Sequence, residues 1–259
     1  MFTVVGTENR RRIRRKAPTL GRVAVPHGVP FYVLRADRRF PTQALFSMAA
    51  RCARDVLTSL PVPPGAPVRV FEPRLFPMRR AADVFVRLLR EAALPPQTLS
   101  IGVYDPVAAL CGRVSPLLPY AADVRIVTRR PVDFDADVLY AAKRFGAGLT
   151  VGESAALLTG CGAVVCAVPD EAFADAPAVL SCVRAAGVFS PVGAALPPAY
   201  ARLCPPDVPP DLFAAALAEL CGVCDAALYA CSGVVFDGQN MRTEQAGALW
   251  RARFLGRKN

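Results

Sequence analysis

The chain has 259 residues, of which 53% are hydrophobic and 20% charged, which is enough apolar material for a buried core. The two longest uncharged runs, residues 154–169 and 185–201, are shorter than the roughly 20 residues of a membrane-spanning helix. The arginine-rich start lacks the apolar stretch of a signal peptide, so we expect a cytoplasmic protein with no membrane partner. In that compartment the nine cysteines are expected to be reduced and to act as small hydrophobic residues.

The net charge of +10 is concentrated at one end of the chain. Residues 1–40 contain ten basic and two acidic residues, a net charge of +8, and the densest block is NRRRIRRK at residues 9–16. Such a block can contact nucleic-acid phosphates in a salt-dependent way. It is also typical of a solvated arm, and no interleaved aromatic residues or RNA-binding motif accompany it.

The first sixty residues contain two recognisable elements. A strand is predicted at residues 30–35 (PFYVLR) and a helix at residues 42–60. The segment PVPPGAP at residues 61–67 is dense in turn-forming residues, and we take it as the boundary of the next domain.

From residue 66 onward, apolar runs of strand length alternate with helical stretches. This alternation is typical of βαβ units and a mostly parallel sheet. The strands near residues 123 and 163 are short and rich in Val and Ile without alternation, as expected when helices cover both faces of the sheet. We therefore predict an α/β fold with a doubly wound, mostly parallel sheet. The predicted strands are 67–72, 98–104, 123–128, 149–151 and 163–168, and the predicted helices are 79–93, 107–119, 134–145 and 153–160.

The C-terminal part begins after a run of prolines between residues 197 and 210. Its predicted elements are a helix at 211–221, a strand at 226–236, a turn at Asp237–Gly238 and a helix at 243–255. The expected organisation is a basic arm (1–20), an N-terminal βα segment (21–65), a Rossmann-like core (66–190) and a C-terminal segment that packs on the core (191–259).

Three stretches between residues 98 and 169 carry a family resemblance: TLSIGVYDPVAA, ADVRIVTRRP and GAGLTVGESAALLTGCGAVVCAVPD. They resemble the nucleotide-binding half of Rossmann-type NAD(P) dehydrogenases, in style closest to the shikimate dehydrogenase group. In that family the second strand ends at the adenosine ribose and a later strand ends near the nicotinamide. The resemblance therefore implies ribose contacts from Thr128, Arg129 and Arg130, and a nicotinamide-side turn at Val168 and Pro169. Because arginines suit a 2′-phosphate and an acidic residue suits free ribose hydroxyls, it points to NADP over NAD.

The turn after the first of these strands departs from the dinucleotide pattern. A GxGxxG turn uses its glycines for backbone geometry and for close approach of the pyrophosphate. This chain offers Gly102, Tyr104, Asp105 and Val107, which we keep as candidate cofactor contacts. Asp105 followed by Pro106 is also the start of a well-capped helix that needs no ligand.

Two readings of function follow, with a third kept open. The first is an NADP-dependent oxidoreductase, a reductase or dehydrogenase of a small-molecule substrate, with catalytic residues unassigned. The alternative is a non-catalytic Rossmann-like protein, either a degenerate enzyme or an interaction module. The third is nucleic-acid binding through residues 9–16.

The remaining constellations are weaker. The only histidine, His27, lies between prolines and is read as a turn residue, and the Cys221–Cys224 pair lacks the second CxxC of a convincing zinc site. Polar residues at 72–74 and 237–242 follow predicted strands, and we expect them to join the same rim as Asp105 if their strands run in the same direction.

Overall fold

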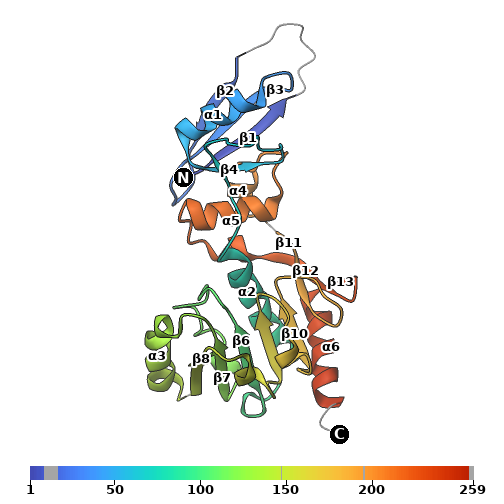
Figure 1. Cartoon of the computed structure of the whole chain (residues 1–259). Helices are drawn as coiled ribbons and strands as arrows, with labels where there is room; N and C mark the ends of the chain where they lie inside the picture. The colour runs from blue at the N-terminus through green and yellow to red at the C-terminus, as the bar shows by residue number, and fades with distance from the viewer. Residues whose placement is uncertain (9–16, 147, 195, 257–259) are drawn as a thin grey trace. The chain divides into compact units, whose positions relative to one another are not determined.

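The computed structural model describes residues 1–8, 17–146, 148–194 and 196–256. These residues form two compact units (Figure 1). Unit 1 comprises residues 1–73 and 194–228, and unit 2 comprises residues 74–193 and 229–259. The predicted core, 66–190, therefore differs from unit 2 at its N-terminal limit and lacks the last segment of the chain. The basic block at residues 9–16 lies outside the described residues.

Unit 1 is built on a five-stranded mixed sheet in the order β2-β3-β1-β4-β5. The central strand β1 pairs in parallel with both β3 and β4, whereas β2 pairs antiparallel with β3. The strand bounds are β1 Thr3–Glu8, β2 Thr19–Val23, β3 Phe31–Asp37, β4 Asp55–Thr58 and β5 Arg69–Val70.

Three helices and an aromatic cluster complete unit 1. The rings of Phe2 and Phe31 stack at 4.9 Å, and Phe213 meets the Phe31 ring edge-on at 5.4 Å. All three phenylalanines are fully buried, so the cluster joins two strands to a helix that is distant in sequence. The helices are α1 Thr42–Cys52, α4 Pro198–Ala201 and α5 Pro210–Leu220.

The predicted helix at residues 42–60 is wrong in its second half. The α1 helix ends at Cys52, because Ala53 has the extended backbone φ of −159°. Residues 55–58 then form β4, whose Val56 and Leu57 are fully buried against β1. Burial in the sheet overrides the helical pattern of the sequence.

Unit 2 contains a five-stranded sheet in the order β10-β9-β6-β7-β8, and every pair of neighbours in it is parallel. Counted from β6, the strands stand in the order 3-2-1-4-5, which is the order of a Rossmann sheet. The predicted α/β class with a mostly parallel sheet is confirmed. The bounds are β6 Ser100–Tyr104, β7 Asp123–Val127, β8 Gly148–Gly152, β9 Ala163–Cys166 and β10 Ala178–Ser181.

The two faces of this sheet are covered differently. One core cluster joins the sheet to α2, α3 and α6, and its largest contact is Trp250 stacked on Phe85 with ring centroids 5.6 Å apart. The cluster on the opposite face contains Leu158 and Phe173 from two short 3-10 helices, η4 and η5. The sheet is thus wound on both sides, but only one side carries α-helices. The bounds are α2 Phe76–Ala92, α3 Asp135–Phe145, α6 Thr243–Gly256, η4 Ala155–Leu158 and η5 Glu171–Phe173.

The predicted helix at residues 107–119 is not formed. Turns occupy this stretch up to a short 3-10 helix, η2 Leu118–Tyr120. Ala108 and Gly112 both have positive φ, of 57° and 70°, and the N–H of Gly112 donates to Asp137 Oδ2 at 2.8 Å. Such left-handed residues and side-chain acceptors interrupt a helical ladder before it can propagate.

A three-stranded sheet in the order β11-β12-β13 follows the parallel one. The turn at Asp237–Gly238 joins β12 to antiparallel β13 with positive φ at both residues, 46° and 78°, as a tight hairpin requires. Residues 237–242 therefore belong to this sheet and not to the rim of the parallel sheet. The strands are β11 Ser190–Ala194, β12 Cys231–Phe236 and β13 Gln239–Met241, and the remaining 3-10 helices are η1 Pro96–Thr98, η3 Pro131–Phe134 and η6 Ala226–Tyr229.

The predicted strand at 67–72 exists only as β5, which pairs with β4 of unit 1. Glu72 and Pro73 belong to unit 1, and Arg74 is the first residue of unit 2. Among the described residues, no helix combines the length and apolar character needed to cross a membrane.

Candidate functional site at the carboxyl edge of the parallel sheet

The ends of β6, β7 and β9 bring most of the predicted site residues to one edge of unit 2. The strands are parallel neighbours, and Tyr104 pairs with Val127 on one side and with Cys166 on the other. The N–H of Ala167, the first residue after β9, donates to the carbonyl of Tyr104 at 3.1 Å. In open α/β sheets, ligands bind at this edge, where the strand order reverses between the first and fourth strands.

Asp105 is fully buried at this edge, as is Ser181 at the end of β10. Asp105 Oδ2 accepts the backbone N–H of Leu110 at 2.8 Å, and the Asp105 N–H donates to the carbonyl of Val127 at 2.9 Å. The carboxylate therefore lies inside the turn after β6 and holds that turn closed.

Burial raises the pKa of the Asp105 carboxyl above its usual value. Hydrogen bonds from the backbone of Leu110, Ala109 and Val107, together with the charge of Arg79, oppose this rise. Arg79 also ties the turn to α2, because its Nε donates to the carbonyl of Ala109 at 2.9 Å.

Cys182, which follows β10, lies near Asp105. Burial raises the pKa of its thiol to about 12, with smaller contributions from the charges of Cys166 and Asp105, whereas the charge of Arg80 lowers it. Arg80, on the first turns of α2, is only 7% exposed. Cys182 thus has a carboxylate, a guanidinium and a second thiol as electrostatic neighbours.

Gly102 lies within β6 and not in the turn that follows it. A Cβ at this position would meet Val164 Cγ2 at 3.0 Å, Leu158 Cδ2 at 3.2 Å and Cys161 Sγ at 3.3 Å. The glycine therefore permits close packing of η4 on the sheet, two residues before the place where a pyrophosphate would lie.

Four further predicted residues lie at the carboxyl edge of the parallel sheet and differ in how far their side chains are exposed. Tyr104 is half-buried, and its ring lies 5.9 Å from that of Phe173. Val107 and Val168 are exposed, at 46% and 54%, and Pro169 is partly exposed. These residues form the outer surface of the edge.

The end of β7 carries the predicted ribose-phosphate contacts. Thr128 is buried, its N–H donates to the carbonyl of Gly152, and its Oγ1 accepts the N–H of Arg130 at 3.3 Å. Arg130 is exposed and pairs with Asp133 at 2.8 Å. Arg129 is exposed too, and its guanidinium has no ion pair among the residues that the structure describes. Of the two arginines, Arg129 is the one available to a ligand.

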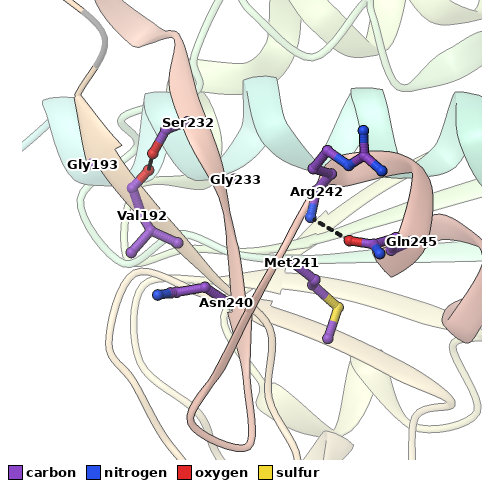
Figure 2. A pocket seen from close by; sticks show the side chains of 8 residues that line it. All are labelled: Val192, Gly193, Ser232, Gly233, Asn240, Met241, Arg242 and Gln245. Atoms are coloured by element: carbon purple, nitrogen blue, oxygen red, sulfur yellow. Dashed lines mark hydrogen bonds between the residues drawn. The ribbon is translucent and has the colours of Figure 1, made fainter.

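A separate pocket of about 370 Å³ lies beside the three-stranded sheet of unit 2 (Figure 2). Its polar lining comes from Ser232, Asn240 and the first residues of α6, and Ser232 donates to the carbonyl of Val192 at 3.1 Å. Gln245 Oε1 accepts the N–H of Arg242 at 3.0 Å and so caps α6. The complete lining is Val192, Gly193, Ser232, Gly233, Asn240, Met241, Arg242 and Gln245.

His27 and the Cys221–Cys224 pair do not form a catalytic or metal-binding cluster within the described residues. His27 is an exposed turn residue with a φ of 56°. Cys221 is buried and Cys224 exposed, and both are free thiols. Within the described part of the chain, no group of three or more His, Cys, Asp or Glu side chains could hold a metal ion.

Sequence reasoning missed Arg79, Arg80 and Cys182. They come from the helix before β6 and from the end of β10, and the fold brings Arg79 and Cys182 near Asp105 and Arg80 near Cys182. The arginine pair near the start of a predicted helix was visible in the sequence, but nothing in its spacing pointed towards Asp105.

No protein-family model matches this chain, and no curated protein matches its sequence. Among solved structures, the chain is similar to the crystal structure of L-tryptophan dehydrogenase from Nostoc punctiforme, with 9% sequence identity. The match covers 88% of this chain and 77% of that chain, at a TM-score of 0.32. The likeness is distant, and the description of unit 2 as Rossmann-like depends on its own strand order.

Proposed function

We propose that this chain is a non-catalytic Rossmann-like protein, which keeps the dinucleotide-binding scaffold but closes the dinucleotide turn with its own carboxylate. The observation that carries the proposal is the buried Asp105 side chain, which accepts the Leu110 N–H inside the turn after β6.

The chemistry of this turn does not fit a pyrophosphate. A Rossmann turn binds phosphate through free backbone N–H groups at the start of a helix. Here no helix follows β6, Pro106 has no N–H, and the Leu110 N–H is already taken by Asp105. A bound phosphate would also face a carboxylate of like charge, so the turn favours its own side chain over an external anion.

The test is a thermal-unfolding series with NADPH, NADP⁺, NADH and no ligand at millimolar concentrations. A ligand at 100 times its Kd would stabilise the folded chain by about 2.7 kcal/mol, or a rise of roughly 5–10 °C in Tm for a chain of this size. We expect a shift below about 1 °C with every nucleotide. A shift of several degrees with any of them would overturn the proposal.

An NADP-dependent oxidoreductase acting on a small molecule is the second candidate, and Arg129 favours it. Its exposed guanidinium follows the second strand of the Rossmann order, where an arginine suits the 2′-phosphate of NADP. This candidate requires the turn at Asp105 to open, because the closed turn leaves no donors for the pyrophosphate.

Arg129→Ala and Arg130→Ala form a matched pair for this candidate. Binding of NADPH, measured by titration calorimetry, should weaken about tenfold or more with Arg129→Ala, and binding of NADH should not change. Arg130→Ala should have the smaller effect, since Arg130 already pairs with Asp133. Equal effects on NADPH and NADH would exclude a role for Arg129 at a 2′-phosphate.

A further inference from the structure

The outward face of α3 exposes large apolar side chains. Leu139 is 60% exposed and Tyr140 49%, and Val132, just before the helix, is 73% exposed. The same helix buries Asp137 and Ala141, which lie on the opposite side at 3.6 residues per turn. An exposed apolar stripe opposite a buried one is typical of an interaction surface.

Charge is arranged symmetrically about the centre of this stripe. Asp135 and Lys143 lie four residues before and four residues after Leu139, so the three share one line along the helix. Both charged residues are exposed, and neither forms an ion pair within the described residues. Along this line, from the N-terminus to the C-terminus of α3, an acidic residue is followed by an apolar one and then by a basic one.

We propose that α3 is the contact helix of a homodimer. Two copies of α3 lie antiparallel about a two-fold axis at Leu139, with Asp135 of each copy opposite the partner's Lys143. Such a contact is isologous, so each ion pair occurs twice and the two leucines meet at the axis. If the two α3 helices were parallel, Asp135 would face the partner's Asp135 and Lys143 would face the partner's Lys143. The equal spacing of Asp135 and Lys143 on either side of Leu139 is what allows both ion pairs to form in the antiparallel arrangement.

The surfaces next to the stripe allow this approach. Ala136 and Ala142 flank Leu139 and are exposed, and Tyr140 lies further round the helix on the side of Ala136. The helix has 11 residues and is about 16 Å long, which limits the contact to the lower range of interface areas. We therefore expect a reversible dimer with a Kd of about 1–100 µM. This contact is independent of the turn at Asp105 and of nucleotide binding.

Sedimentation velocity of the full chain from about 1 to 500 µM measures the dimer directly. Leu139→Glu should make the chain monomeric throughout this range, because two like-charged carboxylates would then replace the apolar contact at the axis. Leu255→Glu is the matched control, since Leu255 on α6 is 47% exposed but lies outside the stripe. Circular dichroism shows whether each variant keeps the helical content of the wild type.

Charge reversal gives the sharper test. Asp135→Lys and Lys143→Glu should each weaken the dimer about tenfold or more, because every reversal replaces two attractions by two repulsions. The double variant Asp135→Lys/Lys143→Glu should return to within about threefold of the wild-type Kd. An equimolar mixture of the two single variants should form a heterodimer, since each chain then carries one sign of charge on the stripe.

Three outcomes overturn the proposal. They are a wild-type chain that remains monomeric at about 500 µM, a dimer that Leu139→Glu and Leu255→Glu affect equally, and a double variant that stays as weak as the single ones. The first would leave the α3 stripe to a different protein, and the other two would place the dimer contact elsewhere.

Discussion

Replacing Asp105 by alanine should destabilise unit 2 by about 1–3 kcal/mol, since the buried N–H of Leu110 would lose its acceptor without gaining water. For a chain of this size the loss corresponds to a fall of roughly 3–10 °C in Tm. Arg79 would keep its bond to the carbonyl of Ala109, so the turn should loosen at residue 110 first.

Asparagine at the same position separates the acceptor from the charge. Asp105→Asn keeps the shape and one acceptor oxygen, so it should lose less stability than Asp105→Ala at pH 7. Because burial raises the pKa of the folded carboxyl above its unfolded value, the folded chain holds the proton more tightly. The stability that the protonated Asp105 contributes is complete below the unfolded pKa of 3.8 and is lost as pH rises through the folded pKa. Relative to the wild type, Asp105→Asn should therefore gain stability as the pH rises above 3.8, until the folded carboxyl has lost its proton.

Trp250 makes the measurement specific to unit 2. It is the only tryptophan of the chain, it is fully buried, and it stacks on Phe85 in the same unit as Asp105. Urea unfolding followed by tryptophan fluorescence therefore reports this unit, even if unit 1 unfolds separately. If Asp105→Ala unfolds at the wild-type urea concentration, the carboxylate does not hold the turn, and the proposed function loses its main support.

Two other predictions address packing and thiol chemistry. Gly102→Ala should lower the free energy of unfolding by about 1–3 kcal/mol, because the new Cβ would press on Val164, Leu158 and Cys161. Gly148→Ala is the control, since its Cβ would meet nothing closer than 3.5 Å and should change stability little. Urea unfolding followed by Trp250 fluorescence compares the two variants, and equal unfolding midpoints would contradict the packing argument. The exposed Cys111 and Cys224 should react with a thiol reagent in the folded chain at pH 8. Cys166 should react only after unfolding, because burial raises the pKa of its thiol to about 12. Mass mapping of the labelled peptides checks this prediction, and early labelling of Cys166 would show that the edge of the sheet opens.

The sequence predicted strands at the positions of β6, β7, β8 and β9, but none at β10 or β11. Residues 100–104 and 163–166 are short apolar runs, and a strand buried on both sides needs no alternation. In β7 the charged residues Asp123 and Arg125 are only half-buried. The helices α2 and α3 have apolar residues at helical spacing, whereas α6 was predicted without a clear apolar periodicity. What these patterns could not supply was strand order, which depends on pairing between residues far apart in the sequence.

Unit 1 shows the opposite case. β1 was not recognised, although it is the central strand, because its six residues stand alone before the basic block. β4 was predicted as helix because Asp55–Thr58 continues the apolar pattern of α1. Both are strands because β1 provides a partner for β3 and β4 at once, and a local pattern carries no information about such partners.

The turn after β6 explains why the scaffold alone does not decide the function. The sequence predicted that Asp105 and Pro106 compete with a phosphate, but it also indicated a helix after them, and a helix would still have offered its N-terminal dipole. The structure has turns there instead, and Asp105 has neighbours from three separate parts of the chain: Arg79 before β6, Leu110 after it, and Cys182 beyond β10. A Rossmann strand order provides a ligand edge only where that edge stays open. The function proposed for this chain therefore depends on Asp105 and on residues that reach it from a distance in sequence, and replacing Asp105 tests that dependence directly.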